Sequence, residues 1–257
     1  MFDVDEYLAV LGCDERPEAD LESLRFLHKR HLMTIPYDSS WNAERGISIW
    51  RDVDIDVDAV FDAVVRGGRG GNCYELNGLF RALLDELGFR TAVLSAGIRQ
   101  VDGTFGPDLE HVFNRVELAG RSWLVDVGFV GPSYVEPLLL SDEEQSQCGS
   151  RFRITEQDGY HVVERKGRTA DWSPVYRFRP TPRQFHEWSG DQPALVEFAE
   201  RLVGAGTVIR GRAFETGQMV LIGRRYLHVD DGAEAVRVLV DQDEHDRVVR
   251  TILRAES

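Results

Sequence analysis

The spacing of apolar residues changes at Gly88, and this change constrains the fold more than any other feature of the chain. Before Gly88, apolar residues recur every three or four positions, and helices are predicted at the start, after Asp20, after Asp56 or Asp58, and from about Cys73 to Leu87, where Gly88 ends the last one. After Gly88 they alternate, as in TAVLSAGIR and HVFNRVEL, and turns with glycine separate the segments. The sequence therefore predicts a helical block followed by a β block.

A third block follows and mixes the two periods. ALVEFAERLVGAG predicts a helix, TVIRGRAF, GQMVLIGRRYLHVD and AVRVLV predict strands, and HDRVVRTIL predicts a closing helix. No internal repeat or low-complexity linker occurs. This order predicts an α+β fold with three compact regions: a helical one at residues 1–88, a β one at 89–190 and a smaller mixed one at 191–257.

Composition and charge disfavour several classes of protein. The 257 residues carry a net charge of −14, so we expect neither nucleic acid nor an anionic membrane as a partner. No apolar run is long enough to span a membrane, and the acidic start MFDVDEYLAVLG is unlike a signal peptide, so we expect a cytoplasmic protein. The three cysteines form no C-x-x-C pair, so neither a metal site nor a disulfide framework is expected.

Two Gly-Gly pairs and an arginine stand directly before a cysteine in RGGRGGNCYELNGLF, residues 66–80. A phosphate-binding loop would need a lysine and a hydroxyl residue after the glycines, and a dinucleotide fingerprint would follow a strand; neither condition holds. The glycines are better explained by a sharp turn that places Cys73 on the first turn of a helix. There, free N–H groups and the helix dipole stabilise a thiolate and can bind an oxyanion.

A free cysteine taken alone is more commonly a small buried residue than a nucleophile, so the nucleophile hypothesis needs a base. The predicted hairpin of HVFNRVEL and RSWLVDVG, joined by Ala119-Gly120, offers one. If Leu118 pairs with Arg121, one side of this hairpin becomes largely apolar, as a core face should be. That pattern supports the register.

The other side of the hairpin carries His111 and Asp126 as diagonal neighbours. Their backbones would be roughly 7–8 Å apart, close enough for the two side chains to share a hydrogen bond. Asp126 could then hold His111 in one tautomer, and His111 could take the proton of Cys73. Each also fits a plain structural role, as a half-exposed strand histidine and an acid near a turn. The remaining histidines lack comparable surroundings: His28, His31, His161, His186, His228 and His245.

The motifs GRGGNCYELN, EHVFNRVE and WLVDVGF, in this order, resemble the signature of arylamine N-acetyltransferases. HLMTIPYD and SPVYRF resemble further landmarks of that family, so the resemblance runs from Met1 to Phe178. It implies an N-terminal helical bundle, a central β-barrel and a small C-terminal α/β lid, in agreement with the three predicted regions. It also implies a catalytic triad of Cys73, His111 and Asp126.

The resemblance further implies roles for residues near the nucleophile. Arg69 and Asp38 correspond to a structural ion pair of the family, and Phe129 corresponds to a position in its acceptor pocket. Asn72 and Tyr74 flank the nucleophile and are further candidates for substrate binding.

Three departures from the family pattern favour its amide synthases, which belong to ansamycin-type polyketide pathways. Tyr37-Asp38-Ser39 stands where Phe-Glu-Asn is usual, Asn72 replaces an often apolar residue, and the C-terminal region, where coenzyme A contacts are expected, is short and only loosely similar. The implied enzyme is a ping-pong N-acyltransferase that passes an acyl chain from a thioester to an aryl amine and releases a polyketide as a macrolactam. The implied donor is the phosphopantetheine thioester of an acyl carrier protein of a polyketide synthase, with no permanently bound cofactor. The alternatives are an acetyl-CoA-dependent arylamine N-acetyltransferase and a cysteine hydrolase.

Overall fold

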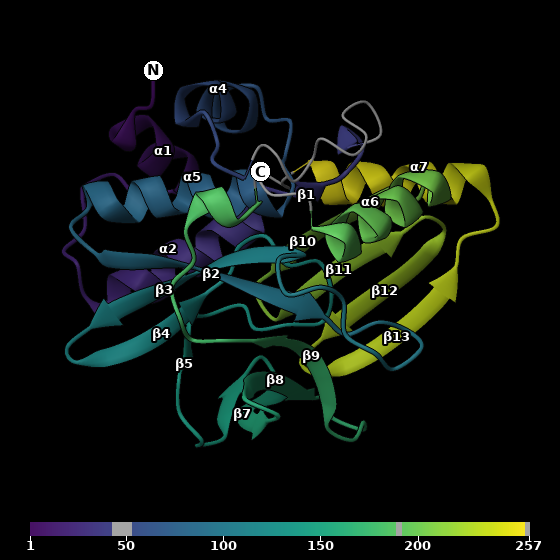
Figure 1. Cartoon of the computed structure of the whole chain (residues 1–257). Helices are drawn as coiled ribbons and strands as arrows, with labels where there is room; N and C mark the ends of the chain where they lie inside the picture. The colour runs from purple at the N-terminus through teal and green to yellow at the C-terminus, as the bar shows by residue number, and fades with distance from the viewer. Residues whose placement is uncertain (43–52, 189–191, 255–257) are drawn as a thin grey trace.

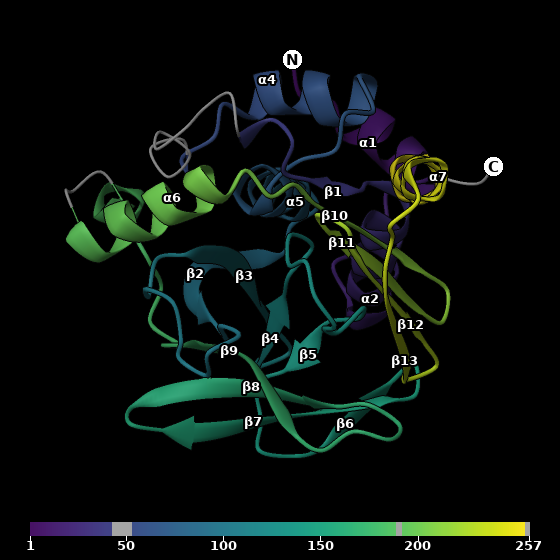
Figure 2. The same ribbon diagram turned by 90° about the vertical axis from the view of Figure 1, so that its right-hand side faces the viewer.

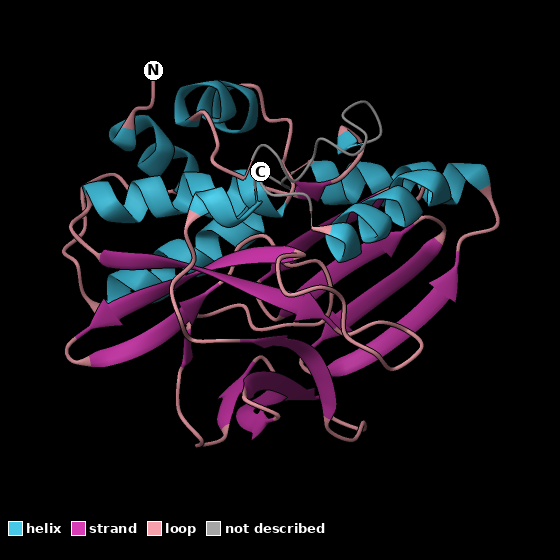
Figure 3. Ribbon diagram, in the orientation of Figure 1, coloured by secondary structure: helices cyan, strands magenta, loops and turns pink. Residues whose placement is uncertain are grey.

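The computed structural model describes residues 1–42, 53–188 and 192–254. Helices gather at the top in the view of Figure 1, a strongly curved sheet lies below them, and a second sheet stands beside both. Figure 3 separates the helices and strands by colour. The predicted α+β class is confirmed.

The N-terminal region is helical, and aspartates cap its helices. Asp20 accepts a hydrogen bond from the Ser23 N–H, and Asp56 accepts one from the Ala59 N–H, so two predicted caps are confirmed. The elements are α1 (Val4–Leu11), α2 (Leu21–Thr34), the short strand β1 (Tyr37–Asp38), α4 (Val57–Phe61), a π-helical turn (Asp62–Arg66) and α5 (Cys73–Glu86).

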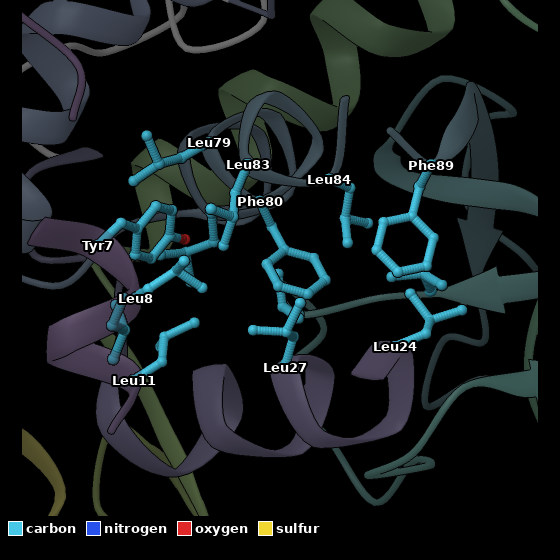
Figure 4. Packing of buried hydrophobic residues seen from close by; sticks show 14 of the residues in the cluster. Tyr7, Leu8, Leu11, Leu24, Leu27, Leu79, Phe80, Leu83, Leu84 and Phe89 are labelled. Atoms are coloured by element: carbon cyan, nitrogen blue, oxygen red, sulfur yellow. The ribbon is translucent and has the colours of Figure 1, made fainter. Parts of the chain in front are cut away.

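Helices α1, α2 and α5 share one apolar core. Figure 4 shows Leu8 and Leu11 of α1, Leu27 of α2, and Phe80 and Leu83 of α5 converging in it, and all five side chains are buried. Burying a side chain of this size contributes about 1.5–3 kcal/mol. The core therefore holds α5, and with it Cys73, firmly against the bundle.

The central region is a curved, barrel-like sheet with the strand order β5-β4-β3-β2-β9-β8-β7-β6 (Figure 2). Its interior is lined by aromatic residues, among them Phe113, Tyr134, Tyr176 and Phe178. The strands are β2 (Arg90–Ile98), β3 (His111–Leu118), β4 (Arg121–Val125), β5 (Leu138–Leu139), β6 (Gln145–Gln147), β7 (Ser150–Gln157), β8 (Tyr160–Lys166) and β9 (Ser173–Phe178).

The predicted register of the β3–β4 hairpin is confirmed. Leu118 pairs with Arg121, and the ladder continues to Val125. Ala119 and Gly120 have φ angles of 50° and 73°, as a two-residue turn with left-handed backbone requires. The ladder ends at Val125, so Asp126 lies on the loop that follows.

The C-terminal region is a second antiparallel sheet with the order β1-β10-β11-β12-β13. Its first strand comes from the N-terminal region, because Tyr37 of β1 pairs with Gly211 of β10. The sequence does not predict this pairing, since two residues carry no periodicity. GQMVLIGRRYLHVD, expected as strand, forms two strands that turn at Gly223. The elements are a 3₁₀ turn (Phe185–Trp188), α6 (Pro193–Ala205), β10 (Ile209–Phe214), β11 (Gly217–Ile222), β12 (Arg225–Asp230), β13 (Ala233–Val238) and α7 (Gln242–Leu253).

The division into three domains stays a prediction. The boundary expected after Gly88 falls between α5 and β2, and the one expected after residue 190 lies outside the described residues. The first and third regions share a sheet through β1. Within the described ranges, no helix is both long enough and apolar enough to cross a bilayer.

Candidate active site

Cys73 is the first residue of α5, as predicted, and Asn72 caps this helix. The Asn72 side-chain oxygen accepts hydrogen bonds from the N–H groups of Tyr74 and Glu75, at 3.0 and 3.1 Å. The Glu75 carboxylate accepts the Asn72 N–H at 3.1 Å, which completes a capping box. No described residue accepts from the N–H of Cys73, so this amide is the one available to an oxyanion.

At two positions near Cys73, neighbouring backbone atoms lie so close that only glycine fits. Gly70 has a φ of +80°, and a Cβ there would lie 2.7 Å from the carbonyl oxygen of Pro36. Gly128 lies on the loop after β4, and a Cβ there would lie 2.8 Å from the Cα of Cys73. The first glycine makes the predicted turn, and the second lets the barrel loop pack directly against the start of α5.

His111 and Asp126 come together as the hairpin register predicts. His111 Nε2 lies 2.7 Å from Asp126 Oδ2, and both residues are 2% exposed. Burial acts to lower the pKa of His111, but the Asp126 charge and hydrogen bonds with Asp126 and Cys73 outweigh it and raise the pKa to about 10. The raised pKa favours the imidazolium form of His111, and an imidazolium beside a thiol stabilises the thiolate.

Two residues not singled out by the sequence position Asp126. Asn77 Nδ2 donates to Asp126 Oδ1 at 3.0 Å, and Asn77 Oδ1 accepts from the Val127 N–H at 2.9 Å. His28 Nε2 accepts the Asp126 N–H at 3.1 Å, while its Nδ1 donates to the Val135 carbonyl at 3.0 Å. Asn77 follows Cys73 by four residues and so shares its helix face, which is a usable signal. The hydrogen bond between His28 and the Asp126 backbone joins residues 98 positions apart, so no local sequence pattern predicts it.

Because His28 and His31 are buried, we expect the free energy of unfolding to decrease at acid pH. Burial lowers the pKa of His28 to about 4 and that of His31 to about 3. The unfolded chain binds these protons below pH 6.5, whereas the folded chain stays neutral there, so stability is fully present above pH 6.5 and is lost as the pH falls toward 4 and 3. No described residue bonds to either ring nitrogen of His31, which packs edge-on against Phe80.

The variant His31→Phe keeps the ring and removes the proton. We expect it to reduce the slope of unfolding free energy against pH by about 1.4 kcal/mol per pH unit between pH 6 and 4. Urea denaturation of the two proteins at several pH values measures this slope. Identical slopes for the wild type and His31→Phe would show that His31 is already protonated in the folded state.

The predicted ion pair between Arg69 and Asp38 is wrong. Arg69 Nη2 lies 2.5 Å from Glu75 Oε1, and Asp38 Oδ1 lies 3.2 Å from Arg210 Nε. Glu75 is on the first turn of α5, within reach of the arginine in the preceding loop. Asp38 faces Arg210 directly across the β1–β10 ladder, where opposite charges attract. The unexpected pairing of β1 therefore gives Asp38 a different partner, and Arg69 pairs with the nearby Glu75 instead.

A cavity of about 790 Å³ opens between the helical bundle, the barrel and the C-terminal sheet. Cys73 and His111 line it, together with all three residues predicted to bind substrate, Asn72, Tyr74 and Phe129. The Phe129 ring lies edge-on to His111, with 5.6 Å between the ring centres. The structure brings these residues to one cavity, and their contact with a substrate stays a prediction.

Comparison with known proteins decides the family. The sequence profile described as N-acetyltransferase matches residues 20–256. The chain is 42% identical over its full length to proansamycin X synthase of Amycolatopsis mediterranei, and it covers 98% of that protein. It is 29% identical to the arylamine N-acetyltransferase of Escherichia coli over 89% of this chain and 80% of that one. The chain belongs to the arylamine N-acetyltransferase family. It is an N-acyltransferase, and the resemblance to ansamycin-pathway members is confirmed.

Solved structures of arylamine N-acetyltransferases show the same fold. The enzyme of Mycobacterium marinum in complex with CoA superposes with a TM-score of 0.81 at 22% identity, over 98% of this chain and 93% of that one. The enzyme of Mycobacterium abscessus superposes with a TM-score of 0.79 at 25% identity, over 98% and 89%. The helical, barrel and C-terminal parts thus follow one family architecture.

Proposed function

We propose that this chain is a cysteine-dependent amide synthase that transfers a long acyl chain from a thioester to an aryl amine. In its natural reaction, the amine lies on the same chain, so the product is a macrolactam released from a polyketide synthase. The donor we propose is the phosphopantetheine thioester of an acyl carrier protein. The observation that carries the proposal is the buried 2.7 Å contact between Asp126 and His111, which lines a large cavity together with Cys73.

The first half-reaction acylates Cys73. The thiolate attacks the thioester carbonyl, a carbon–sulfur bond forms, and the carbonyl electrons move to oxygen. The N–H of Cys73 stabilises this oxyanion. When the oxyanion collapses, the donor sulfur leaves with the bonding pair and takes the proton held by His111. The acyl-enzyme then faces a neutral imidazole.

The second half-reaction forms the amide. The aryl amine attacks the acyl carbonyl, and His111 takes the proton that the nitrogen must lose. Collapse expels the Cys73 thiolate and restores the imidazolium beside it. Asp126 holds Nε2 of His111, so the other ring nitrogen, Nδ1, serves both proton transfers. An aryl amine is neutral at pH 7, so the site has to exclude water rather than activate the acceptor.

The size of the cavity favours a long acyl chain over acetyl. Ligand pockets of about 300–1,000 Å³ hold drug-sized molecules, and the 790 Å³ here lies toward the upper end of that range. The name of the A. mediterranei relative points the same way. Acetyl-CoA is the second candidate donor, favoured by the fold shared with the CoA-bound M. marinum enzyme.

A cytoplasmic location is proposed as well, because the three cysteines are free thiols.

The proposed function is tested by following the acyl group. Dodecanoyl and acetyl thioesters of N-acetylcysteamine are mixed with the enzyme, and intact-protein mass spectrometry follows acylation before and after adding 3-hydroxyaniline. We expect faster acylation by dodecanoyl than by acetyl, and amide formation once the amine is added. An acyl-enzyme that hydrolyses at the same rate with and without amine would indicate a cysteine hydrolase. Fast acetylation by acetyl-CoA with poor dodecanoyl transfer would indicate an acetyltransferase.

A further inference from the structure

One face of the C-terminal sheet turns toward the active-site cavity. Residues that pair directly across an antiparallel ladder point to the same face. Ile209, Ile222 and Arg225 pair in succession across β10, β11 and β12, and all three line the cavity. Glu234 on β13 lines it too. We call this side of the sheet the cavity face.

Beside the charged residues Arg225 and Glu234, the cavity face carries exposed apolar residues. Val236 and Val238 of β13 share the alternation of Glu234 and so lie on this face, and Val236 pairs with Leu227. The two valines are 51% and 64% exposed, and Ile222 is 41% exposed. We call Ile222, Leu227, Val236 and Val238 the outer apolar strip. Figure 1 shows β13 at the free edge of the sheet, with β12 beside it.

The opposite face of the same sheet is covered by α7 over part of its width, although the β13 residues on that face are exposed. Leu221, Tyr226 and Leu239 form a buried cluster there with Val248 and Ile252 of α7. The apolar residues on that face therefore have a structural role, whereas those of the outer apolar strip stay in contact with solvent. Exposed apolar residues gathered on one surface mark a binding site more often than scattered ones do.

We propose that the outer apolar strip binds the distal part of a long, apolar acyl chain whose carbonyl is attached to Cys73. This inference rests on the proposed function. Cys73 and Ile222 line one continuous cavity, so a chain that leaves the sulfur can reach the strip without crossing a wall. The strip ends on β13, which lies three strand spacings, or about 14 Å, from Ile209 on β10.

One exposed apolar residue outside the C-terminal sheet also lines the cavity. Val101, on the loop after β2, lines the same cavity and is fully exposed. An acyl chain that leaves Cys73 through this cavity could contact Val101 as well as the strip, and would remove apolar surface of both from water. Acetyl ends close to Cys73 and reaches neither Val101 nor the strip. The strip should therefore discriminate by chain length and leave the chemistry at Cys73 unchanged.

The test is Val236→Glu, which places a charge in the strip at a site that is already exposed. The rate of Cys73 acylation is measured by intact-protein mass spectrometry with acetyl, hexanoyl and dodecanoyl thioesters of N-acetylcysteamine. We expect the dodecanoyl rate to fall by about tenfold or more and the acetyl rate to stay within about twofold of wild type. Val236→Thr, which keeps the shape, should give a smaller loss in the same order of chain lengths.

Ala235→Glu is the matched control, because it adds the same charge to an exposed residue on the opposite face of the same strand. We expect it to behave as wild type with all three thioesters. If Val236→Glu keeps the wild-type preference for dodecanoyl, the inference is wrong and the proposed function stands. If Val236→Glu keeps that preference but dissociates a dimer in size-exclusion chromatography, the strip is a contact between two copies, and the inference is again wrong. If no thioester acylates the wild type, the proposed function itself fails.

Discussion

Replacing Cys73 with alanine should lower kcat/KM for amide formation by at least about 10³-fold and abolish the acyl-enzyme. Alanine leaves the helix start and the capping box of Asn72 intact but removes the only atom that can carry the acyl group. Cys73→Ser should be nearly as inactive, because a hydroxyl is not ionised beside His111 at neutral pH. Amide formation and intact mass, measured with a dodecanoyl thioester and an aryl amine, provide the readout.

The two other cysteines serve as controls for this result. Cys13 and Cys148 are free thiols far along the chain from the site, and Cys13→Ala and Cys148→Ala should keep wild-type rates. If Cys73→Ala still formed an acyl adduct or the amide at more than a trace rate, the covalent mechanism would be wrong. Direct attack of the amine on a bound thioester would then be the remaining route.

Asp126→Asn should lower kcat by about 10³–10⁴-fold with little change in the folded structure. Asp126 Oδ1 accepts two N–H donors, from Asn77 Nδ2 and Gly128 N, so the asparagine oxygen has to stay at that position. The new NH₂ group then faces His111 Nε2 and forces that nitrogen to accept. The proton moves to Nδ1, and the imidazole can no longer take a proton from the thiol or the amine.

The same substitution changes the titration of His111. Without the carboxylate, burial still lowers the pKa of His111 and the largest cause that raises it is gone, so the pKa should fall. NMR titration of the His111 ring, with a thermal melt to check folding, measures the effect. Asp142→Asn, at an exposed carboxylate, should leave activity and titration unchanged. An Asp126→Asn enzyme with a wild-type titration of His111 would contradict the proposed role of Asp126.

Much of the site could be predicted because its signals are local. The change of hydrophobic period at Gly88 separates bundle from barrel, and the Ala119-Gly120 turn sets the register that aligns His111 with Asp126. Asn72 also carried a local signal, since an asparagine three residues before a glutamate is the pattern of a capping box. The substrate-binding role expected for Asn72 therefore leaves out the structural role of this residue as the cap of α5.

The errors arose where residues distant in sequence meet. The expected Arg69–Asp38 pair failed because β1 joins β10, and this pairing turns Asp38 toward Arg210. A two-residue strand has no periodicity, so the sequence does not predict which strand it pairs with. The contact of His28 with the Asp126 backbone is hidden for the same reason.

By itself, the sequence predicted that Cys73 begins a helix and that His111 and Asp126 come together, because helix starts and hairpin registers follow from short-range backbone preferences. Only the tertiary structure decided how these residues are supported and what surrounds them. Asn77 and His28 hold Asp126, and the cavity takes its outer wall from a sheet built of strands from both ends of the chain. The packing of distant segments depends on the shapes of whole surfaces, which no local pattern of residues encodes.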